Sequence, residues 1–264
     1  MLGAIIGDII GSVYEWNNIK TKEFEITNPK AFFTDDTVLT VAVAQGFMNA
    51  SLEDEKSIQD CIRDALLEYG LAYPHAGYGG RFNGWLRGEN HQPYNSWGNG
   101  SAMRVSSAAY FACRLEEAIL FARLSASVTH DHPEGLKGAE AVAGAVYLAR
   151  QEGSKGEIRK FIEDGYYPLN FTLDEIRPFY EFDVSCQGTV PQAIIAFLEA
   201  DSFEETIRNA ISIGGDSDTL AAIAGGIAGA FYGVPYSLRD MAMDKLDDKL
   251  RHVVYMFEER FGEY

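Results

Sequence analysis

The feature that most constrains the fold is the stretch from Ser212 to Tyr232, SIGGDSDTLAAIAGGIAGAFY. Two glycines lead into a polar cluster at 216–219, and a run of Ala, Gly and Ile follows. Glycine inside a helix costs about 1 kcal/mol relative to alanine. So many small residues are therefore best explained by neighbouring helices that pack close to the backbone. The apolar part is also shorter than the roughly 20 residues that span a bilayer. The stretch predicts the central helix of a helical protein.

The acids at the start of this helix have two explanations. Asp, Ser and Thr are good N-cap residues, and acids suit the positive end of a helix dipole. One Asp satisfies that need, whereas Asp216, Asp218 and Thr219 together exceed it. Carboxylates crowded in a buried place repel each other unless a cation lies between them. Oxygen ligands suit Mg²⁺ or Mn²⁺ rather than zinc. From this stretch alone, capping and metal binding both remain open.

A second stretch has the same make-up. In FFTDDTVLTVAVAQGFM, residues 32–48, Thr34, Asp35 and Asp36 precede a segment that is apolar almost all round. A surface helix would show a charged face, and this one shows none. Capping could account for one such cluster. It accounts less well for two clusters of the same make-up at the N-termini of two buried helices. Together the clusters supply enough oxygen ligands for two cations about 3.5–4 Å apart, so we expect a dinuclear site.

The N-terminal stretch adds a third acid. Residues 1–15 read as a helix in which Gly3, Gly7 and Gly11 recur every four positions, which places them on one close-packing face. Glu15 follows at the polar end, and the pattern alone makes it a solvated acid after a buried helix. Residues 17–31 are polar and are expected to form a loop.

The segment 74–100 is rich in glycine and aromatic residues and predicts a long structured loop. Its end, Trp97 to Gly100, opens a helix expected over 101–115. Glycines at a helix start let backbone N–H groups approach an anion. Trp97 and Asn99 would then contact a base and a sugar or phosphate. The alternative is a glycine-rich turn in which Trp97 simply packs.

Two histidines follow a helix that is expected to end at Val128, in the segment THDHPEG. Their spacing does not place them on one helix face. His130 is a candidate for ligand contact. His132 precedes Pro133, which starts the next helix, so a capping role is sufficient for it.

Strand signal is almost absent, so we expect an all-α protein of about ten to thirteen helices. They should pack as a single compact orthogonal bundle, one domain over residues 1–264, with the acids at helix N-termini. The remaining helices are expected near 54–72, 136–150, 155–164, 173–180, 188–200, 203–211 and 238–261.

Composition limits the partners. The formal charge of −17 argues against a nucleic-acid surface. An anionic ligand would need a local reversal of the field, which bound cations would provide. Three well-separated cysteines suggest reduced thiols, and the N-terminus lacks the basic region of a signal peptide. We therefore expect a cytoplasmic protein, a monomer with no membrane partner.

Five pieces of the chain resemble the ADP-ribosylglycohydrolase family, which includes the dinitrogenase-reductase-activating glycohydrolase and the ADP-ribosyl-acceptor hydrolases. In the family's order they are GDIIGSVYE (7–15), FTDDT (33–37), SWGNGSAMR (96–104), THDHPEG (129–135) and GGDSDTLAAIAGGIAGA (214–230). Any one of these would be weak evidence, but the set is specific. The resemblance implies an all-α fold with two Mg²⁺ or Mn²⁺ ions and hydrolysis of the glycosidic bond between ADP-ribose and its acceptor.

The resemblance also implies roles for individual residues. The metal ligands would be Thr34, Asp35, Asp36, Asp216, Asp218 and Thr219, with Asp218 bridging the two ions. Glu15 matches a mobile acid over the site, and Glu15 and Asp36 are the candidate catalytic acids. The substrate-binding residues would be Asp35, Ser96, Trp97, Gly98, Asn99, Gly100, Met103, His130 and Gly215.

The acceptor stays open on these grounds, because the loop before Trp97 differs from that of the vertebrate members. The candidates are ADP-ribosyl-arginine or ADP-ribosyl-serine in a protein and a small conjugate such as O-acetyl-ADP-ribose. Two rival readings are a catalytically idle ADP-ribose-binding protein and a dinuclear-metal hydrolase of another nucleotide. The presence of every expected acid argues against the idle protein.

Overall fold

The computed structural model describes residues 1–262, so the last two residues of the expected domain 1–264 lie outside the described residues. Within 1–262 the chain is all-α, as expected, and contains no β-strand. Gly98 and Ser185 form an isolated antiparallel bridge. The helices are α1 Leu2–Gly11, α2 Asp35–Asn49, α3 Glu55–Ala72, α4 Gly80–Arg87, α5 Gly100–Met103, α6 Ala108–Phe111, α7 Leu115–Ser127, α8 Pro133–Arg150, α9 Lys155–Gly165, α10 Leu173–Ile176, α11 Cys186–Leu198, α12 Phe203–Ser212, α13 Ser217–Tyr232, α14 Tyr236–Lys245 and α15 Asp248–Phe261.

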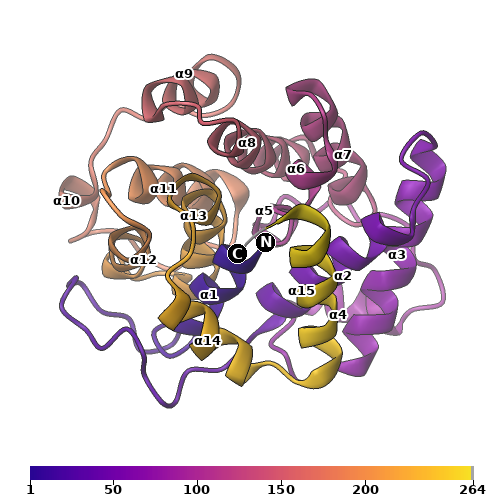
Figure 1. Ribbon diagram of the computed structural model, residues 1–264, viewed down its shortest axis with the longest axis horizontal. Coiled ribbons are helices and arrows are strands. Elements are labelled where there is room, and N and C mark those ends of the chain that lie inside the picture. The colour runs from indigo at the N-terminus through magenta and orange to yellow at the C-terminus, as the bar shows by residue number, and fades with distance from the viewer. Residues whose placement is uncertain (263–264) are drawn as a thin grey trace.

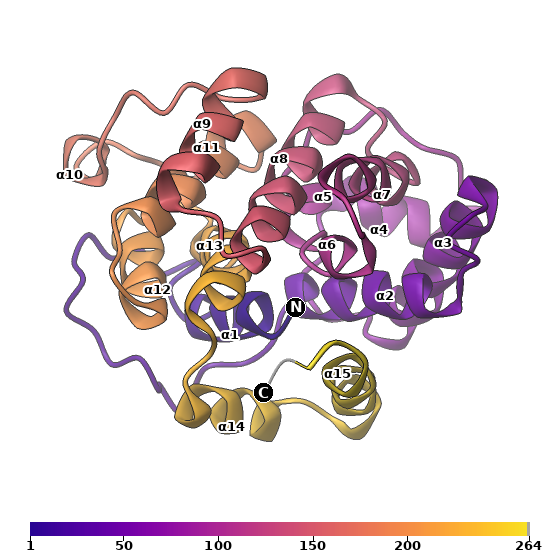
Figure 2. The same cartoon turned by 45° about the horizontal axis from the view of Figure 1, so that its top comes forward.

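Helices α1 and α13 form the centre of the molecule, and the other helices surround them at varied angles (Figure 1). Helices α8, α11 and α12 pack against α13, whereas α2 packs against α1, α3 and α15. The turned view shows α14 and α15 along one edge of the molecule and α9 with α10 along the opposite edge (Figure 2).

Small residues let the two central helices approach closely. A methyl group placed on Gly3 would lie 2.2 Å from the Gly225 carbonyl oxygen, and one on Gly7 would lie 2.0 Å from that of Ala221. At Gly11 the nearest atom would be the Cα of Asp218, at 2.5 Å. The glycine face expected in 1–15 is thus confirmed, and so is the close packing expected of the central stretch.

The order of these contacts shows that α1 runs antiparallel to α13. Position 3 lies beside 225, position 7 beside 221 and position 11 beside 218. The end of α1 and the Glu15 that follows it are therefore brought to the beginning of α13, where Asp216 and Asp218 lie. This arrangement positions the candidate site.

Several expected elements differ in the structure. Residues 74–100 are not wholly loop, because Gly80–Arg87 forms α4, whose Phe82, Trp85 and Leu86 are buried. The helix expected over 101–115 is broken into α5 and α6. The helix expected over 238–261 is two helices, α14 and α15, separated at Leu246 and Asp247. Fifteen helices within 1–262 exceed the ten to thirteen expected, because these short elements carry little periodic signal.

Among the helices of 1–262, none combines the length and the apolar character that crossing a membrane requires.

Candidate metal and ligand site

A cavity of about 420 Å³ opens where the N-termini of α2 and α13 meet. Acids line its floor, and one wall is formed by the loop that leads into α5. The expected site residues that line it are Glu15, Asp35, Asp36, Ser96, Gly98, Asn99, Gly100, Met103, His130, Asp216, Asp218 and Thr219. The structure therefore brings together residues that are up to 204 positions apart, from Glu15 to Thr219 (219 − 15 = 204).

Capping does not account for the acids of α13. Asp216 occupies the N-cap position, yet its side chain forms no capping hydrogen bond. Its carboxylate instead accepts a 2.7 Å hydrogen bond from the Asn99 amide across the cavity. Asp218 accepts from the backbone N–H of the next residue, Thr219. Both acids are almost fully buried, so the capping alternative leaves their presence unexplained.

At the start of α2 a hydroxyl is the N-cap, so the carboxylates there are not needed for capping. The Thr34 side chain accepts from the backbone N–H of Asp36. Asp36 is buried, and one of its carboxylate oxygens accepts a 3.2 Å hydrogen bond from the Thr219 hydroxyl, which links α2 to α13. Its other oxygen, Oδ1, has no partner among the described residues. An unpaired buried carboxylate oxygen is costly unless a ligand completes it.

The electrostatics of the cluster point the same way. Burial raises the pKa of Asp36 well above its usual value, and the negative charge of Asp218 adds to the rise. The pKa of Asp218 is raised by burial and then by Asp216. Burial and the charge of Asp216 raise the pKa of Glu15 to about 7, and burial and Asp8 raise that of Asp35 to about 8. The cluster is therefore unfavourable as a set of bare charges.

These residues fit a divalent cation. Two groups of carboxylates have oxygens within 4.8 Å of one another: Asp8, Asp36 and Asp218 form one, and Glu15, Asp216 and Asp218 form the other. Asp218 belongs to both. The donors are oxygens only, which suits Mg²⁺ or Mn²⁺. The unpaired oxygen of Asp36 gives an independent reason to expect a ligand there.

Asp8 is a site residue that the sequence pattern did not reveal. It lies in α1, is fully buried, and accepts from the backbone N–H groups of Thr34 and Thr37 and from the Thr34 hydroxyl at 2.6 Å. It thereby fixes the start of α2 beside α1. The sequence did offer one indication of this role, a charged residue inside an otherwise apolar helix. A buried charge needs partners, so such a residue is a candidate for a site.

Two further residues hold the segment that carries Glu15. The Asn18 amide donates to the carbonyl oxygens of Glu15 and Gly215 and accepts from the Gly215 N–H at 2.6 Å. Lys20 donates to the carbonyl oxygens of Tyr180 and Ile213. The beginning of the loop 17–31 is therefore attached to the turn before α13. From the sequence, the polar composition of residues 17–31 predicted only a loop and not this attachment.

Three of the expected site residues, Thr34, Trp97 and Gly215, do not line the cavity. The Thr34 hydroxyl is engaged by Asp8, and Gly215 has a φ of 76° and shapes the turn before α13. Trp97 is about half exposed; its ring meets that of His132 edge-on and lies under the Arg81 guanidinium. His132 caps α8 through Nδ1, as its position before Pro133 had suggested. The Asn99 amide is held by Asp216 and Thr189, so it orients the Asp216 carboxylate.

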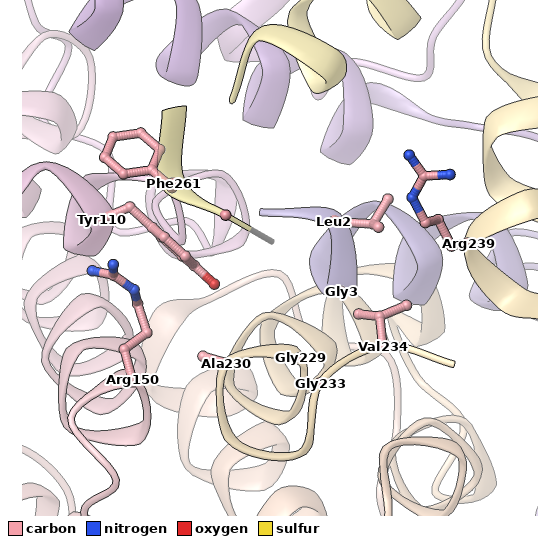
Figure 3. Close-up of a pocket in the computed structure, with 11 residues that line it drawn as sticks. Leu2, Gly3, Tyr110, Arg150, Gly229, Ala230, Gly233, Val234, Arg239 and Phe261 are labelled. Carbon is pink, nitrogen blue, oxygen red and sulfur yellow. The ribbon is translucent and has the colours of Figure 1, made fainter. Parts of the chain in front are cut away.

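A second cavity, of about 240 Å³, lies between the start of α1 and the segment that joins α13 to α14. Figure 3 shows its lining, with Arg150 and Arg239 on opposite sides. Arg239 is paired with Glu258, and Arg150 donates to the Ala109 carbonyl and lies over the Tyr110 ring. No Asp or Glu of residues 1–262 lines this cavity, so the part of its lining that the structure describes lacks the carboxylates of the first cavity.

The chain is also similar to known proteins in sequence and in fold. A model of the ADP-ribosylglycohydrolase family matches residues 1–261. The chain is 28% identical to "ADP-ribosylhydrolase ARH3" of Mus musculus, over 89% of this chain and 83% of that protein. It is 25% identical to "ADP-ribosylarginine hydrolase Tri1" of Pseudomonas putida, over 89% of this chain and 70% of that protein. A solved structure described as an "ADP-ribosylglycohydrolase-related protein complex" superposes with a TM-score of 0.70, at 22% identity, over 98% of this chain and 96% of that one.

Proposed function

Because the chain belongs to the ADP-ribosylglycohydrolase family, we propose that it hydrolyses the glycosidic bond between ADP-ribose and an acceptor and releases ADP-ribose. One observation carries the proposal: the acids of α2 and α13 converge with Glu15 on the floor of a cavity whose opposite wall is a glycine-rich loop with His130. Relatives named ADP-ribosylhydrolase and ADP-ribosylarginine hydrolase support the same class of reaction.

We further propose that two divalent cations, Mg²⁺ or Mn²⁺, are held by Thr34, Asp35, Asp36, Asp216, Asp218 and Thr219. Asp218 belongs to both carboxylate groups and is the bridging candidate. Asp8 belongs to one of these groups, with Asp36 and Asp218, and it either shares in the ligand set or only fixes Thr34. When bound, the cations would neutralise the acids and orient the hydroxyl groups of the ribose next to the scissile bond.

The chain's own groups would then carry the proton transfers. Cleavage of a glycosidic bond passes through an oxocarbenium-like state, whose positive charge nearby carboxylates stabilise. Glu15 lines the cavity and is only partly buried, so a proton can pass between its carboxylate and water or a leaving group. Asp36 is the second candidate, from the floor. One of the two would protonate the acceptor as it leaves or activate the water.

The opposite wall would bind the rest of ADP-ribose. Ser96, Gly98 and Gly100 offer a close backbone approach, and His130 faces the same loop. Met103 and Asp35 also line the cavity. Arg81 lines the cavity and lies over the Trp97 ring, and a guanidinium beside an aromatic ring suits a phosphate and a nucleoside base.

The test is hydrolysis of ADP-ribosyl-arginine and ADP-ribosyl-serine peptides and of O-acetyl-ADP-ribose, each with Mg²⁺, with Mn²⁺ and with EDTA. We expect metal-dependent release of ADP-ribose with its pyrophosphate intact from at least one substrate. Release of AMP or inorganic phosphate would contradict the proposal and favour a hydrolase of another nucleotide bond. Binding of ADP-ribose without any turnover would favour an idle binding protein.

A further inference from the structure

The active-site wall contains a buried cation without an ion pair. Arg104 is fully buried at the end of α5, beside the cavity. It forms no ion pair with any carboxylate of residues 1–262, and two of its three nitrogens, Nε and Nη1, have no hydrogen-bond partner. The Phe82 ring lies 5.7 Å from its guanidinium carbon. Its one side-chain hydrogen bond runs from Nη2 to the Thr129 hydroxyl, at 2.6 Å.

The direction of this bond fixes the next one. A guanidinium only donates, so the Thr129 oxygen accepts from Arg104. The same oxygen lies 2.7 Å from Nδ1 of His130. Thr129 is fully buried, and within residues 1–262 its hydroxyl has no acceptor other than this nitrogen. An unpaired buried donor is costly, so the hydroxyl donates to Nδ1.

A ring nitrogen that accepts a hydrogen bond is not protonated, so in a neutral imidazole the hydrogen lies on Nε2. The imidazole is neutral because burial and the positive charges of Arg104 and Arg81 lower the pKa of His130 well below its usual value. The Arg104–Thr129–His130 chain therefore leaves one uncharged donor, Nε2–H, at the far side of the ring.

That donor faces the glycine-rich loop Gly98–Gly100, which is expected to bind the ligand. A methyl group on Gly100 would lie 3.3 Å from Nε2, and one on Gly98 would lie 3.6 Å from it. No described residue forms a hydrogen bond with Nε2, although His130 is only 4% exposed. The Tyr94 ring packs against the imidazole, at 5.7 Å between centroids, and limits its rotation.

We propose that Arg104 and Thr129 are positioning residues that hold His130 as the Nε2–H tautomer, so that it donates one hydrogen bond to an oxygen of ADP-ribose lying along Gly98–Gly100. The identity of the ligand rests on the function proposed above, whereas the tautomer does not depend on it. A neutral donor of fixed direction recognises a particular oxygen, whereas a charged imidazolium would attract any anion.

The first test measures the tautomer directly in the whole chain, by long-range ¹H–¹⁵N correlation spectra of the histidine rings. The His130 signals are assigned by their loss in His130→Gln. We expect Nε2–H and a bare Nδ1 in the unmodified chain and in Thr129→Ser. Protonation on Nδ1 in the unmodified chain would overturn the proposal whether or not the protein binds ADP-ribose.

The second test measures ADP-ribose binding by calorimetry. Thr129→Val keeps the shape of the side chain but removes the hydroxyl, and we expect the Kd to rise about tenfold, the loss of one hydrogen bond to a polar ligand. Thr129→Ser restores the hydroxyl and should return the Kd to within about twofold of the unmodified value. Equal Kd values for Thr129→Val and the unmodified chain would overturn the proposal.

A third variant, Arg104→Met, removes the donor to Thr129 and keeps a side chain of similar length. We expect a mixture of His130 tautomers and a weaker ADP-ribose affinity, with kcat changed less than KM. An unchanged single Nε2–H tautomer would remove Arg104 from the proposal. Failure of the unmodified chain to bind ADP-ribose, with Nε2–H observed, would refute the proposed function and leave the positioning role standing.

Discussion

At the scale of residues, the candidate site is defined by carboxylates whose surroundings oppose their charge. Asp36 and Asp218 are buried; burial and the charge of Asp218 raise the pKa of Asp36, and burial and the charge of Asp216 raise the pKa of Asp218. A protein gains nothing in stability from such an arrangement unless a cation or a substrate completes it. The same repulsion between carboxylates therefore lowers the stability of the metal-free protein and favours the binding of a cation.

Replacing one of these acids separates the two effects. We expect metal-free Asp218→Asn to be more stable than the metal-free parent, by about 1 kcal/mol or about 2–4 °C in Tm, because the amide relieves repulsion. Added Mg²⁺ or Mn²⁺ should raise the Tm of the parent and not that of the variant, and hydrolysis should be lost. Thermal scans with the metal and with EDTA provide the measurement.

The matched control is Asp164→Asn, in which the acid is exposed and pairs with Lys160 on the surface of α9. An exposed pair contributes little, so this variant should keep both the Tm and the metal response of the parent. A full metal-dependent rise in the Tm of Asp218→Asn would remove Asp218 as the bridging ligand.

The sequence predicted the acids at the starts of α2 and α13 better than their supporting residues. Repeated Thr and Asp before two apolar helices was a local pattern, and it led to Asp36 and Asp218. Asp8, Asn18 and Arg104 act through contacts with residues far along the chain, such as Asn18 with Gly215. Local patterns carry no information about such partners, so these roles became visible only in the fold.

At the scale of elements, the antiparallel pair of α1 and α13 determines where the acids meet. Its packing was foreseeable, because glycines every four residues in 1–15 and small residues in 212–232 both call for close neighbours. That α1 and α13 pack against each other was not foreseeable, because periodicity shows which face of a helix is buried but not which helix packs against it. Short helices such as α4 and α6 were missed because one or two turns give too few residues for a period.

A single methyl group tests this packing. On Gly7 it would meet the backbone of α13, with the Ala221 oxygen at 2.0 Å, and backbone atoms cannot move aside as a side chain can. We expect Gly7→Ala to lower the free energy of unfolding by about 3 kcal/mol or more, measured by urea denaturation followed by far-UV circular dichroism.

Gly84 in α4 provides the control, because nothing lies within 4 Å of a methyl group placed there. Gly84→Ala should change the free energy of unfolding by no more than about 1 kcal/mol, on the stabilising side, since alanine is the better helix former. If the two variants were equally stable, the contact between α1 and α13 would not be as close as described.

At the scale of the whole molecule, residues from both ends of the chain share one core and one site. Helix α1 packs against α13, and α2 packs against α15 near the C-terminus. We therefore propose that the chain is a single domain that unfolds as one unit. The all-α class and the bundle were predictable from the absence of strand signal, but the exchange of contacts between the two ends was not.

Cooperative unfolding has a direct measurement. In urea, the loss of far-UV circular dichroism and the change in tryptophan fluorescence should give the same midpoint. Trp85 in α4 is buried, Trp16 lines the cavity, and Trp97 lies next to Ser96 and Gly98 of its lining, so the fluorescence reports on α4 and the cavity, whereas circular dichroism reports on all the helices. Saturating Mg²⁺ should shift both midpoints equally. Two separate midpoints would indicate more than one domain.

The order in which the chain is made gives the α1–α13 pairing a consequence for synthesis in the cell. Asp36 and Asp216 are 180 residues apart (216 − 36 = 180). At roughly 5–20 residues per second, the ribosome takes roughly 10–40 s to add the second set of acids after the first. During that time the glycine face of α1 lacks its partner α13 and is available to chaperones. A chain released before Asp216 lacks Asp216 and Asp218, so premature termination yields a product without the complete carboxylate cluster.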